Sequence, residues 1–450
     1  MKRLPLLLSL ALLAACGAVG NGPGETPLAP EPVVQLRKQA GDAQTAAIGT
    51  AVDVDPLVAV SDARGQPVAG VPVAFVVTED GWVSAEVDTT DAQGRASTRW
   101  YLGAVTGTQT LRAQMPGGAG VLFSAEATRL EPGRSYFGRN RYVELIPGEL
   151  PLILSVPHDG ALTPAEIPNR TRGTLVRDGQ TLNVARAIDA AYRARGGRRP
   201  WLVLTHLHRT KLDANRPIEE GAQGNRWAEQ AWREFHGFIE AARAQLAHEQ
   251  GRGFYVDLHG HGHEQQRLEL GYLLTGAELA LPDSVLNSPA LVEKSSIRTL
   301  VGRSGRTHAE LLRGPLSLGA LLEVQGFPSV PSVAQPHPAA APYFTGGYNT
   351  LRHGSRDGGL VSGVQLELHA RGVRSDSTAR ARFAEGFVAA LDAFFAAHFG
   401  DALSAASAPI GLHDDGALHV PRADAAQPRR SARPVEVADR PHPGQRKAAQ

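Results

Sequence analysis

The chain has almost no cysteine: Cys16 is the single one among 450 residues. A disulfide bond within the chain, a cysteine nucleophile and a cysteine-ligated zinc site are therefore excluded. Net charge is also nearly absent, since 46 Lys and Arg residues are balanced by 45 Asp and Glu residues, which leaves +1. This balance provides no field that would recruit nucleic acid or an anionic membrane, so we expect no nucleic-acid partner.

A long apolar run is missing at the start of the chain, where residues 6–15 fall short of the roughly 20 residues that a bilayer-spanning helix needs. The run follows a short basic region and ends in the sequence LAAC at residues 13–16, which is typical of a lipoprotein signal peptide. We expect residues 1–15 to be removed and Cys16 to become the lipidated first residue of the mature protein. The alternative is an ordinary signal peptide cleaved nearby, with Cys16 incidental. The expected location is the bacterial cell envelope, facing the periplasm or the surface, with membrane contact only through the lipid.

The rest of the chain divides into segments of different composition. At 450 residues it exceeds the size that one hydrophobic core supports, so several domains are expected. Residues 16–32 are rich in Gly and Pro and predict a flexible tether, whereas residues 401–450 are polar and predict a disordered tail. Between them we expect two domains, at residues 33–128 and 135–400.

The first of these domains alternates short apolar runs with turn residues, which is the pattern of an all-β sandwich. Gly65 and Gly94 end two of the turns and supply the positive φ that such turns need. The segment resembles the bacterial Ig-like domains of the invasin and intimin type in GD at 41–42, VAGV at 68–71, TDAQGRA at 90–96 and GT at 107–108. The resemblance implies a spacer or an adhesive module. We favour a spacer, because a single module beside a catalytic-looking domain needs no ligand of its own.

The second domain alternates apolar runs, at residues 152–156, 201–205 and 254–258, with stretches of helical periodicity at 181–195 and 226–250. Strands that alternate with helices predict an α/β fold. The expected fold class is therefore multidomain: an all-β Ig-like sandwich followed by an α/β domain. Its sheet should be mixed, mostly parallel and covered by helices on both faces.

Two histidine motifs follow predicted strands, where an open α/β sheet places its ligand crevice. In SVPHDG (155–160), His158 suits a metal ligand because neutral imidazole is the commonest zinc donor, although a lone loop histidine is more often structural. In YVDLHGHGH (255–263), His259 is the expected ligand and Asp257 can accept a hydrogen bond from its ring. Alternate residues of an extended segment lie about 7 Å apart, so three ligands to one ion would be strained. His261 and His263 are therefore expected to line the pocket.

A third motif, RTKLDANRP at residues 209–217, offers groups that grip a carboxylate. Arg209 and Arg216 carry planar guanidinium groups that can donate two parallel hydrogen bonds, and Asn215 adds a neutral donor. The alternative is a solvated basic loop; we favour a substrate-carboxylate clamp. A Gly-rich loop that contains Tyr348 is expected to close over the substrate.

These motifs, with the late strand VQLEL at 364–368, occur in the order of the N-formylglutamate amidohydrolases, and the resemblance covers roughly residues 140–398. That family is similar in fold to zinc carboxypeptidases and aspartoacylases, which hold zinc through His, an acidic residue and a second His. The resemblance implies a zinc cofactor on His158 and His259, a substrate carboxylate held by Asn215 and Arg216, and Glu367 as the general base.

The third zinc ligand is an open question, because Ala161 stands three residues after His158, where the carboxypeptidases place a glutamate. We favour Asp178, which we expect at the start of the next helix, where a carboxylate is held rigidly. Glu166 and Asp159 are the alternatives, and Asp178 can also serve merely as a helix cap.

The expected function is that of a zinc-dependent hydrolase that cleaves an amide bond next to a carboxylate. The expected substrate is a small acylated amino acid, a peptide or a cell-wall peptide, because an exported protein has little use for the family's intracellular substrate. The alternatives are a surface binding protein that has lost its metal, or an adhesin that uses the Ig-like domain.

Overall fold

The computed structural model describes residues 34–78, 80–118 and 120–404. The predicted signal peptide, the lipidated Cys16, the tether at 16–32 and the predicted tail beyond residue 404 lie outside the described residues. Within the part that is described, every helix is too short or too polar to cross a membrane.

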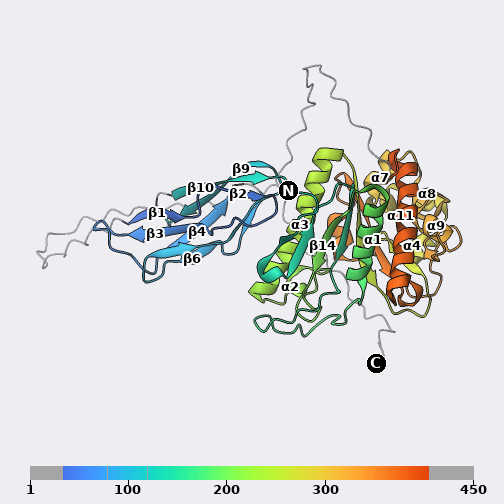
Figure 1. Ribbon diagram of the computed structural model, residues 1–450, viewed down its shortest axis with the longest axis horizontal. Helices are drawn as coiled ribbons and strands as arrows, with labels where there is room; N and C mark the ends of the chain where they lie inside the picture. Colours follow the sequence, from blue (N-terminus) through green and yellow to red (C-terminus); the bar gives the residue numbers. More distant parts are fainter. Residues whose placement is uncertain (1–33, 79, 119, 405–450) are drawn as a thin grey trace, which may run out of the picture.

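The N-terminal strands form two main sheets that enclose a common apolar interior (Figure 1). One sheet has the order β1 (Gln35–Ala40), β3 (Leu57–Ser61), β7 (Arg95–Ser97). The other has the order β2 (Gln44–Ala47), β10 (Gly120–Thr128), β9 (Gly107–Gln114), β4 (Pro72–Val77), β6 (Val87–Thr89), and β5 (Trp82–Val83) pairs with β8 (Trp100–Tyr101). Alternate residues of both sheets, such as Val58 and Phe75, are buried in one cluster. The predicted all-β sandwich is confirmed.

The turn before β7 shows why the sequence places a glycine there. Gly94 has φ +71°, and a Cβ at this position would lie 2.4 Å from the carbonyl oxygen of Val60. The Asp91 carboxylate accepts hydrogen bonds from the backbone N–H groups of Gln93 and Arg95, which closes the turn. Both features are as expected for a tight turn between short strands.

The second region is built on an eight-stranded sheet. Its strand order is β11 (Tyr136–Phe137), β12 (Val143–Ile146), β14 (Trp201–Thr205), β13 (Leu152–Val156), β15 (Gly253–Gly260), β18 (Val361–Leu368), β16 (Leu268–Gly271), β17 (Ser329–Val330). Strands β14, β13, β15 and β18 run parallel to one another, and β16 pairs with β17 in parallel. The pairings β11–β12, β12–β14 and β16–β18 are antiparallel. The predicted mixed, mostly parallel sheet is confirmed.

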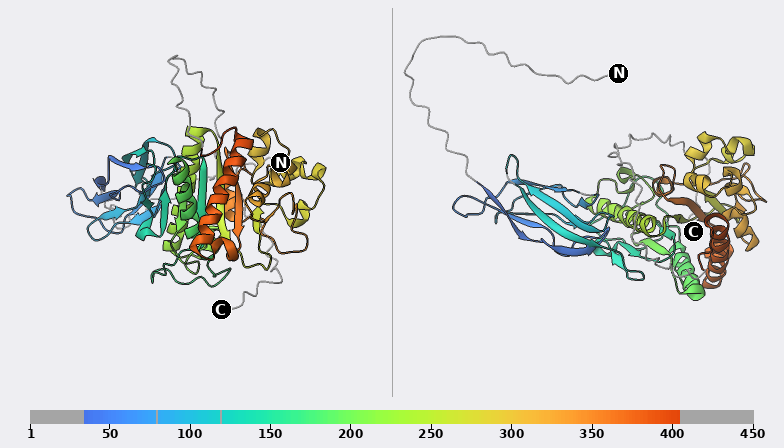
Figure 2. Two further views of the ribbon diagram at one scale, coloured as in Figure 1. Left: turned by 45° about the vertical axis from the view of Figure 1, so that its right-hand side comes forward. Right: turned by 90° about the horizontal axis from the view of Figure 1, so that it is seen from above.

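Helices cover both faces of this sheet, as predicted (Figures 1 and 2). Helix α3 (Arg226–Gln250) packs on one face, and α1 (Thr181–Gly196) and α11 (Ser377–Phe399) pack on the other. On β13, Leu154 belongs to the cluster of α1 and α11, whereas Ile153 belongs to that of α3. A strand buried on both faces needs the continuous apolar run that the sequence shows. The predicted bounds of α3 are correct, and α1 ends one residue later than expected.

Several short helices complete the region, and none of them was predicted from the sequence. They are α2 (Ile218–Gly221), α4 (Gly276–Leu279), α5 (Asp283–Leu286), α6 (Pro289–Lys294), α7 (Arg298–Arg303), α8 (His308–Arg313), α9 (Leu318–Val324), α10 (Tyr348–His353), a 3-10 turn at Arg139–Arg141 and a π-type turn at Ala370–Arg374. Most of them lie between β16 and β17.

The sandwich packs against α3, and the two regions share one apolar cluster. Buried polar groups cross the same contact: the Tyr101 hydroxyl donates to Oε1 of Glu234 at 2.5 Å, and Gln230 donates to that hydroxyl at 2.7 Å. Burial raises the pKa of Glu234, although the bond from Tyr101 acts against the rise. Apolar and polar contacts therefore both hold the sandwich against α3.

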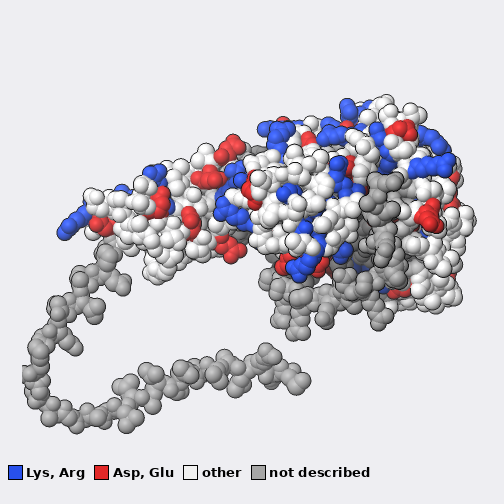
Figure 3. Space-filling view, turned by 90° about the horizontal axis from the view of Figure 1, so that it is seen from below, with Lys and Arg blue, Asp and Glu red and all other residues white. Residues whose placement is uncertain are grey.

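Charged side chains of both signs are interspersed on the face of the molecule that Figure 3 shows, on the narrow strand-rich lobe and on the larger lobe. This distribution matches a net charge of +1.

Candidate metal centre

The two histidine motifs meet at one edge of the large sheet, because the parallel strands β13 and β15 end there. His158 lies two residues beyond the end of β13, and His259 is the second-last residue of β15. Both side chains are almost completely buried, with exposed fractions of 1% and 2%. The strand pattern of the sequence is what brings them together.

Asp178 completes a group with these two histidines. Its Oδ2 atom lies 3.2 Å from Nδ1 of His158 and 3.1 Å from Nδ1 of His259, and all three ligand atoms lie within 4.8 Å of one another. Ligand atoms on a tetrahedral ion with bonds of about 2.0–2.1 Å lie roughly 3.3 Å apart. The distances from the Asp178 oxygen to the two Nδ1 atoms therefore fit a metal ion, and the two nitrogens lie within 4.8 Å of each other.

The other ring nitrogens of the two histidines each face a carboxylate. Nε2 of His158 lies 2.7 Å from Oδ1 of Asp213, and Nε2 of His259 lies 2.7 Å from Oδ2 of Asp257. A carboxylate that accepts Nε2–H leaves the Nδ1 lone pair free, which is how metal-binding histidines are commonly oriented. Asp257 had been predicted for this role. Asp213 had not, although it stands in the third motif two residues before Asn215.

The charges in the group favour a cation. Burial acts against the charged form of Asp178, but hydrogen bonds with His158 and His259 hold the pKa of its carboxyl well below the ordinary range. Burial likewise disfavours protonated His259, yet Asp257 and Asp178 hold its pKa well above the ordinary value. The buried carboxylates thus stabilise positive charge at this position.

The three carboxylates considered for the third ligand lie in different places. Asp178 alone among them belongs to the histidine group. Asp159 accepts hydrogen bonds from Arg177 at 2.7 Å and from the backbone N–H of Leu182 at 2.9 Å. Glu166 bonds to the Tyr142 hydroxyl. Asp159 and Glu166 therefore have other partners.

Asp178 does not begin α1, as the sequence had suggested, but lies in the turn before it. The helix begins at Thr181 and its N-cap is Gln180, with φ 74°. The backbone N–H of Asp178 donates to the carbonyl oxygen of His158 at 3.1 Å, and that of Gly260 donates to Oδ2 at 3.3 Å. These bonds to the neighbouring loops, rather than the helix, fix the carboxylate.

Gly160 explains how His158 reaches its position. A Cβ on Gly160 would lie 2.2–2.3 Å from backbone atoms of His206 and Leu207. The loop after β13 therefore packs directly on the loop after β14, and only glycine permits the close approach.

Glu367 stands beside the histidine group on β18, directly opposite His259 in the parallel pairing. Gln365 donates to its Oε1 atom at 2.9 Å, while Oε2 is buried without a hydrogen-bond partner. Burial raises its pKa to about 7; His259 lowers the pKa, and the nearby carboxylates of Asp178 and Glu269 raise it.

Every residue of β18 is buried, and Glu367 is 4% exposed. The strand is buried because it is flanked by β15 and β16 and covered on both faces. Gln365, two residues earlier and on the same side of the strand, is the partner that the sequence analysis had not singled out.

The two arginines of the predicted carboxylate clamp have different surroundings in the structure. Arg209 donates from Nε to Asp213 and from Nη1 to Asp178, both at 3.1 Å, and is 11% exposed. Arg209 therefore holds carboxylates of the protein. Arg216 is exposed, and its guanidinium forms no hydrogen bond or ion pair with the residues described here.

Asn215 lies between the two arginines and close to the histidine group. Its Nδ2 atom is 3.3 Å from Nε2 of His259, and its Oδ1 accepts from the backbone N–H of Asn349 at 2.7 Å. A Cβ on Gly347 would lie 2.5 Å from its side chain, so the Gly-rich loop needs glycine there. Tyr348 follows in that loop, as the first residue of α10, and its ring packs against Trp232.

Arg374 connects the loops around the group. It is 9% exposed and donates to the carbonyl oxygens of Leu368 at 3.0 Å, His261 at 3.2 Å and Gly179. A Cβ on Gly260 would lie 2.6 Å from its guanidinium carbon. His261 and His263 lie beyond this point and gather with Glu269 in a second group, separate from the first.

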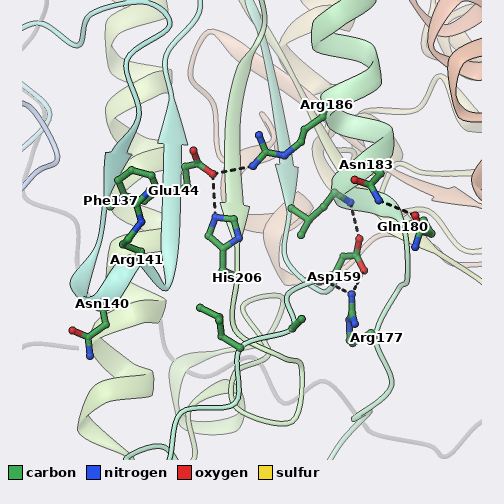
Figure 4. Close-up of a pocket in the computed structure, with 13 residues that line it drawn as sticks. Phe137, Asn140, Arg141, Glu144, Asp159, Arg177, Gln180, Asn183, Arg186 and His206 are labelled. Atoms are coloured by element: carbon green, nitrogen blue, oxygen red, sulfur yellow. Dashed lines mark hydrogen bonds and ion pairs between the residues drawn. The ribbon is translucent and has the colours of Figure 1, made fainter. Parts of the chain in front are cut away.

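Asp159, the residue that follows His158, lines a cavity of about 710 Å³ together with Arg177 and Glu144 (Figure 4). In this cavity Glu144 accepts from His206 at 3.0 Å and from Arg186 at 3.1 Å. Burial acts against ionised Glu144, but these partners lower its pKa to about 2. The three residues of the histidine group do not line this cavity.

Fold and site together define a two-part protein, in which an all-β sandwich packs on an α/β region with a candidate metal centre at its sheet edge.

No protein-family model matches the chain, and no curated protein matches it. Several solved structures are similar to parts of it. N-formylglutamate amidohydrolase from Ralstonia eutropha JMP134 is 14% identical, with 57% of this chain and 97% of that chain covered and a TM-score of 0.35.

A gene product of Agrobacterium tumefaciens is 17% identical, with 56% of this chain and 94% of that chain covered and a TM-score of 0.34. The D00-D0 domain of intimin is 18% identical, with 24% of this chain and 52% of that chain covered and a TM-score of 0.18. This chain thus spans about half the length of the intimin fragment.

Proposed function

We propose that the protein is a zinc-dependent hydrolase that cleaves an amide bond next to a carboxylate. The observation that carries the proposal is the arrangement of His158, Asp178 and His259, in which two Nδ1 atoms and one carboxylate oxygen converge. Two histidines and one carboxylate leave the fourth position of a tetrahedral ion open, as in catalytic zinc sites. The bonds from Nε2 to Asp213 and Asp257 supply the outer partners that such ligands need.

Zinc at this position would polarise the substrate carbonyl and lower the pKa of a bound water. Glu367 would accept a proton from the attacking water at Oε2 and deliver it to the nitrogen of the leaving amine. Its Oε1 atom is held by Gln365, whereas Oε2 has no other partner. A pKa near 7 suits a group that must both take and release a proton.

Arg216 and Asn215 are the proposed binding groups for the substrate carboxylate. The Arg216 guanidinium has no partner among the described residues, and Asn215 places its amide next to His259. A carboxylate bound there would hold the neighbouring amide bond close to the metal position. The substrate class is a small acylated amino acid, a peptide or a cell-wall peptide.

Export of the protein is part of the proposal. The motif at residues 13–16 supports lipidation of Cys16 and a location in the cell envelope. If Cys16 is lipidated, the Cys16→Ser variant should be lost from the membrane fraction. Unchanged retention of this variant in the membrane fraction would contradict lipidation of Cys16.

The metal content of the purified protein tests the main proposal. We expect zinc in the wild-type protein and its loss in His158→Ala, because two ligands provide too little affinity. A surface binding protein or an adhesin is the second candidate, and the N-terminal sandwich is the observation in its favour. Absence of zinc from His158, Asp178 and His259 in the wild-type protein would favour that candidate.

A further inference from the structure

Strand β15 ends at Gly260, between the first and the second of the three alternating histidines His259, His261 and His263. Beyond this point the histidines belong to different groups. His259 joins the first group, whereas His261 and His263 turn toward Glu269 on β16. The ligand atoms of these last three residues all lie within 4.8 Å of one another. Two imidazoles and a carboxylate thus form a second set of metal-binding side chains, outside the proposed catalytic group.

The geometry of each member suits a metal ligand. Nε2 of His261 lies 2.8 Å from the carbonyl oxygen of Arg267, so its Nε2–H is donated and Nδ1 keeps its lone pair. Nδ1 receives only a long contact of 3.2 Å from the backbone N–H of His263. Nδ1 of His263 lies 2.9 Å from Oε1 of Glu269, and the backbone N–H of Phe344 donates to Oε2 of Glu269 at 2.9 Å.

A fourth histidine next to this set gives an independent indication. The ring centroid of His369 lies 6.4 Å from that of His261. His369 is 7% exposed, and its ring nitrogens form no hydrogen bond of regular geometry, although the backbone of Arg371 approaches the ring. Buried polar atoms normally have partners, and a buried imidazole without one is costly unless something else binds it. Because the ring of His369 is adjacent to that of His261, it is available to an ion, or to the water of an ion, held by His261.

An ion pair between His263 and Glu269 is the simpler explanation of part of the cluster. Arg267 also approaches Glu269, with Nε 3.8 Å from Oε1. This explanation accounts for two of the residues, but it gives no role to His261, whose Nδ1 accepts only one hydrogen bond of 3.2 Å, or to the buried ring of His369. A metal ion accounts for all four residues.

We infer that the protein binds a second divalent transition-metal ion at His261, His263 and Glu269, with His369 nearby as a direct or water-mediated partner. Imidazole-rich sites of this kind favour zinc and its neighbours cobalt, nickel and copper over magnesium or calcium. The second ion lies on the far side of Glu367 from the first group, because Glu269 is paired with Glu367 and Glu367 is paired with His259. The inference does not depend on the proposed reaction.

Titration of chelator-treated full-length protein with Zn²⁺ and Co²⁺ tests the inference, with the number of ions per chain measured by elemental analysis and Co²⁺ absorption. We expect two ions in the wild-type protein, one in His263→Ala and one in His259→Ala. His248→Ala, on the exposed side of α3, is the matched control and should keep two. Thermal unfolding of each variant verifies that it is folded.

The outcomes separate the two sites. One ion that is lost in His259→Ala but kept in His263→Ala would overturn the second site and leave the proposed function standing. One ion with the reverse dependence would support the second site and contradict the catalytic group. Anomalous X-ray scattering at the zinc edge from wild-type crystals provides a check without any substitution: a peak at His261 and His263 is expected, and its absence at saturating zinc would overturn the inference.

Discussion

Oδ1 of Asp213 lies 2.7 Å from Nε2 of His158, and each of the two side chains is only 1% exposed. Asp213 also accepts hydrogen bonds from Arg209 and from the backbone N–H of Asn215. It therefore fixes the orientation of the imidazole and is not itself a member of the candidate metal-binding group.

Asp213→Asn should weaken zinc binding by roughly 10- to 100-fold, because a neutral amide neither stabilises nor orients the His158 ring as a carboxylate does. The measurement is a competition with a chelator of known affinity. Asp357→Asn, an exposed carboxylate in the same region, is the control and should bind zinc as the wild-type protein does. Unchanged affinity in Asp213→Asn would show that the contact is only structural.

Glu367→Gln should keep its zinc and lower kcat by about 100-fold or more, because the amide cannot accept the proton of the attacking water. In the wild-type protein, activity should fall as the pH drops, since Glu367 must be ionised to act as a base. Burial raises its pKa to about 7 and a nearby cation lowers it, so the acid limb of the pH profile should lie at or below pH 7. Full activity of the Gln variant on N-acyl amino acids would refute the assignment.

Arg216→Ala should raise KM for N-acyl amino acids with a free carboxylate by roughly 10-fold or more, since a charge-assisted bond to the substrate is lost. Amidated analogues, which have no carboxylate, should be affected much less. Arg216→Lys keeps the charge without the planar pair of donors and should fall between the two. An equal effect on both kinds of substrate would place the carboxylate elsewhere.

Tyr101→Phe should destabilise the protein by about 1–3 kcal/mol, because Glu234 would remain buried without the hydroxyl that donates to it. Urea unfolding measures the loss. Combining the change with Glu234→Gln gives the coupling across the contact between sandwich and α3. Additive effects of the two substitutions would mean that the contact does not connect the regions energetically.

The sequence predicted the elements whose signals are local. The apolar periodicity of residues 226–250 predicted α3, and the continuous apolar run at residues 152–156 predicted a buried strand. The two histidines of the site followed from their positions after strands. Each of these inferences needs only a short stretch of chain.

The remaining features depend on contacts between distant segments. Asp178 lies beside His158 because its backbone bonds to the loop after β13, and no spacing rule distinguishes it from Asp159 or Glu166. Asp213 takes its role only once the loop after β14 reaches His158. Glu367 is buried because β16 pairs with β18 from outside, and β16 comes from a part of the chain for which no strand was predicted.

Arg374 ties three loops together through their carbonyl oxygens: the loop that carries Asp178, the end of the strand that carries Glu367, and the loop that carries His261. A change in the length of one of these segments would move its carbonyl away from the guanidinium, so we expect such a change to need matching changes in the other two. Position 260 must remain glycine to make room for the arginine. Transplanting a single one of these loops into another scaffold would leave its carbonyl unpaired, so a designer who wants the site must move all three together with Arg374.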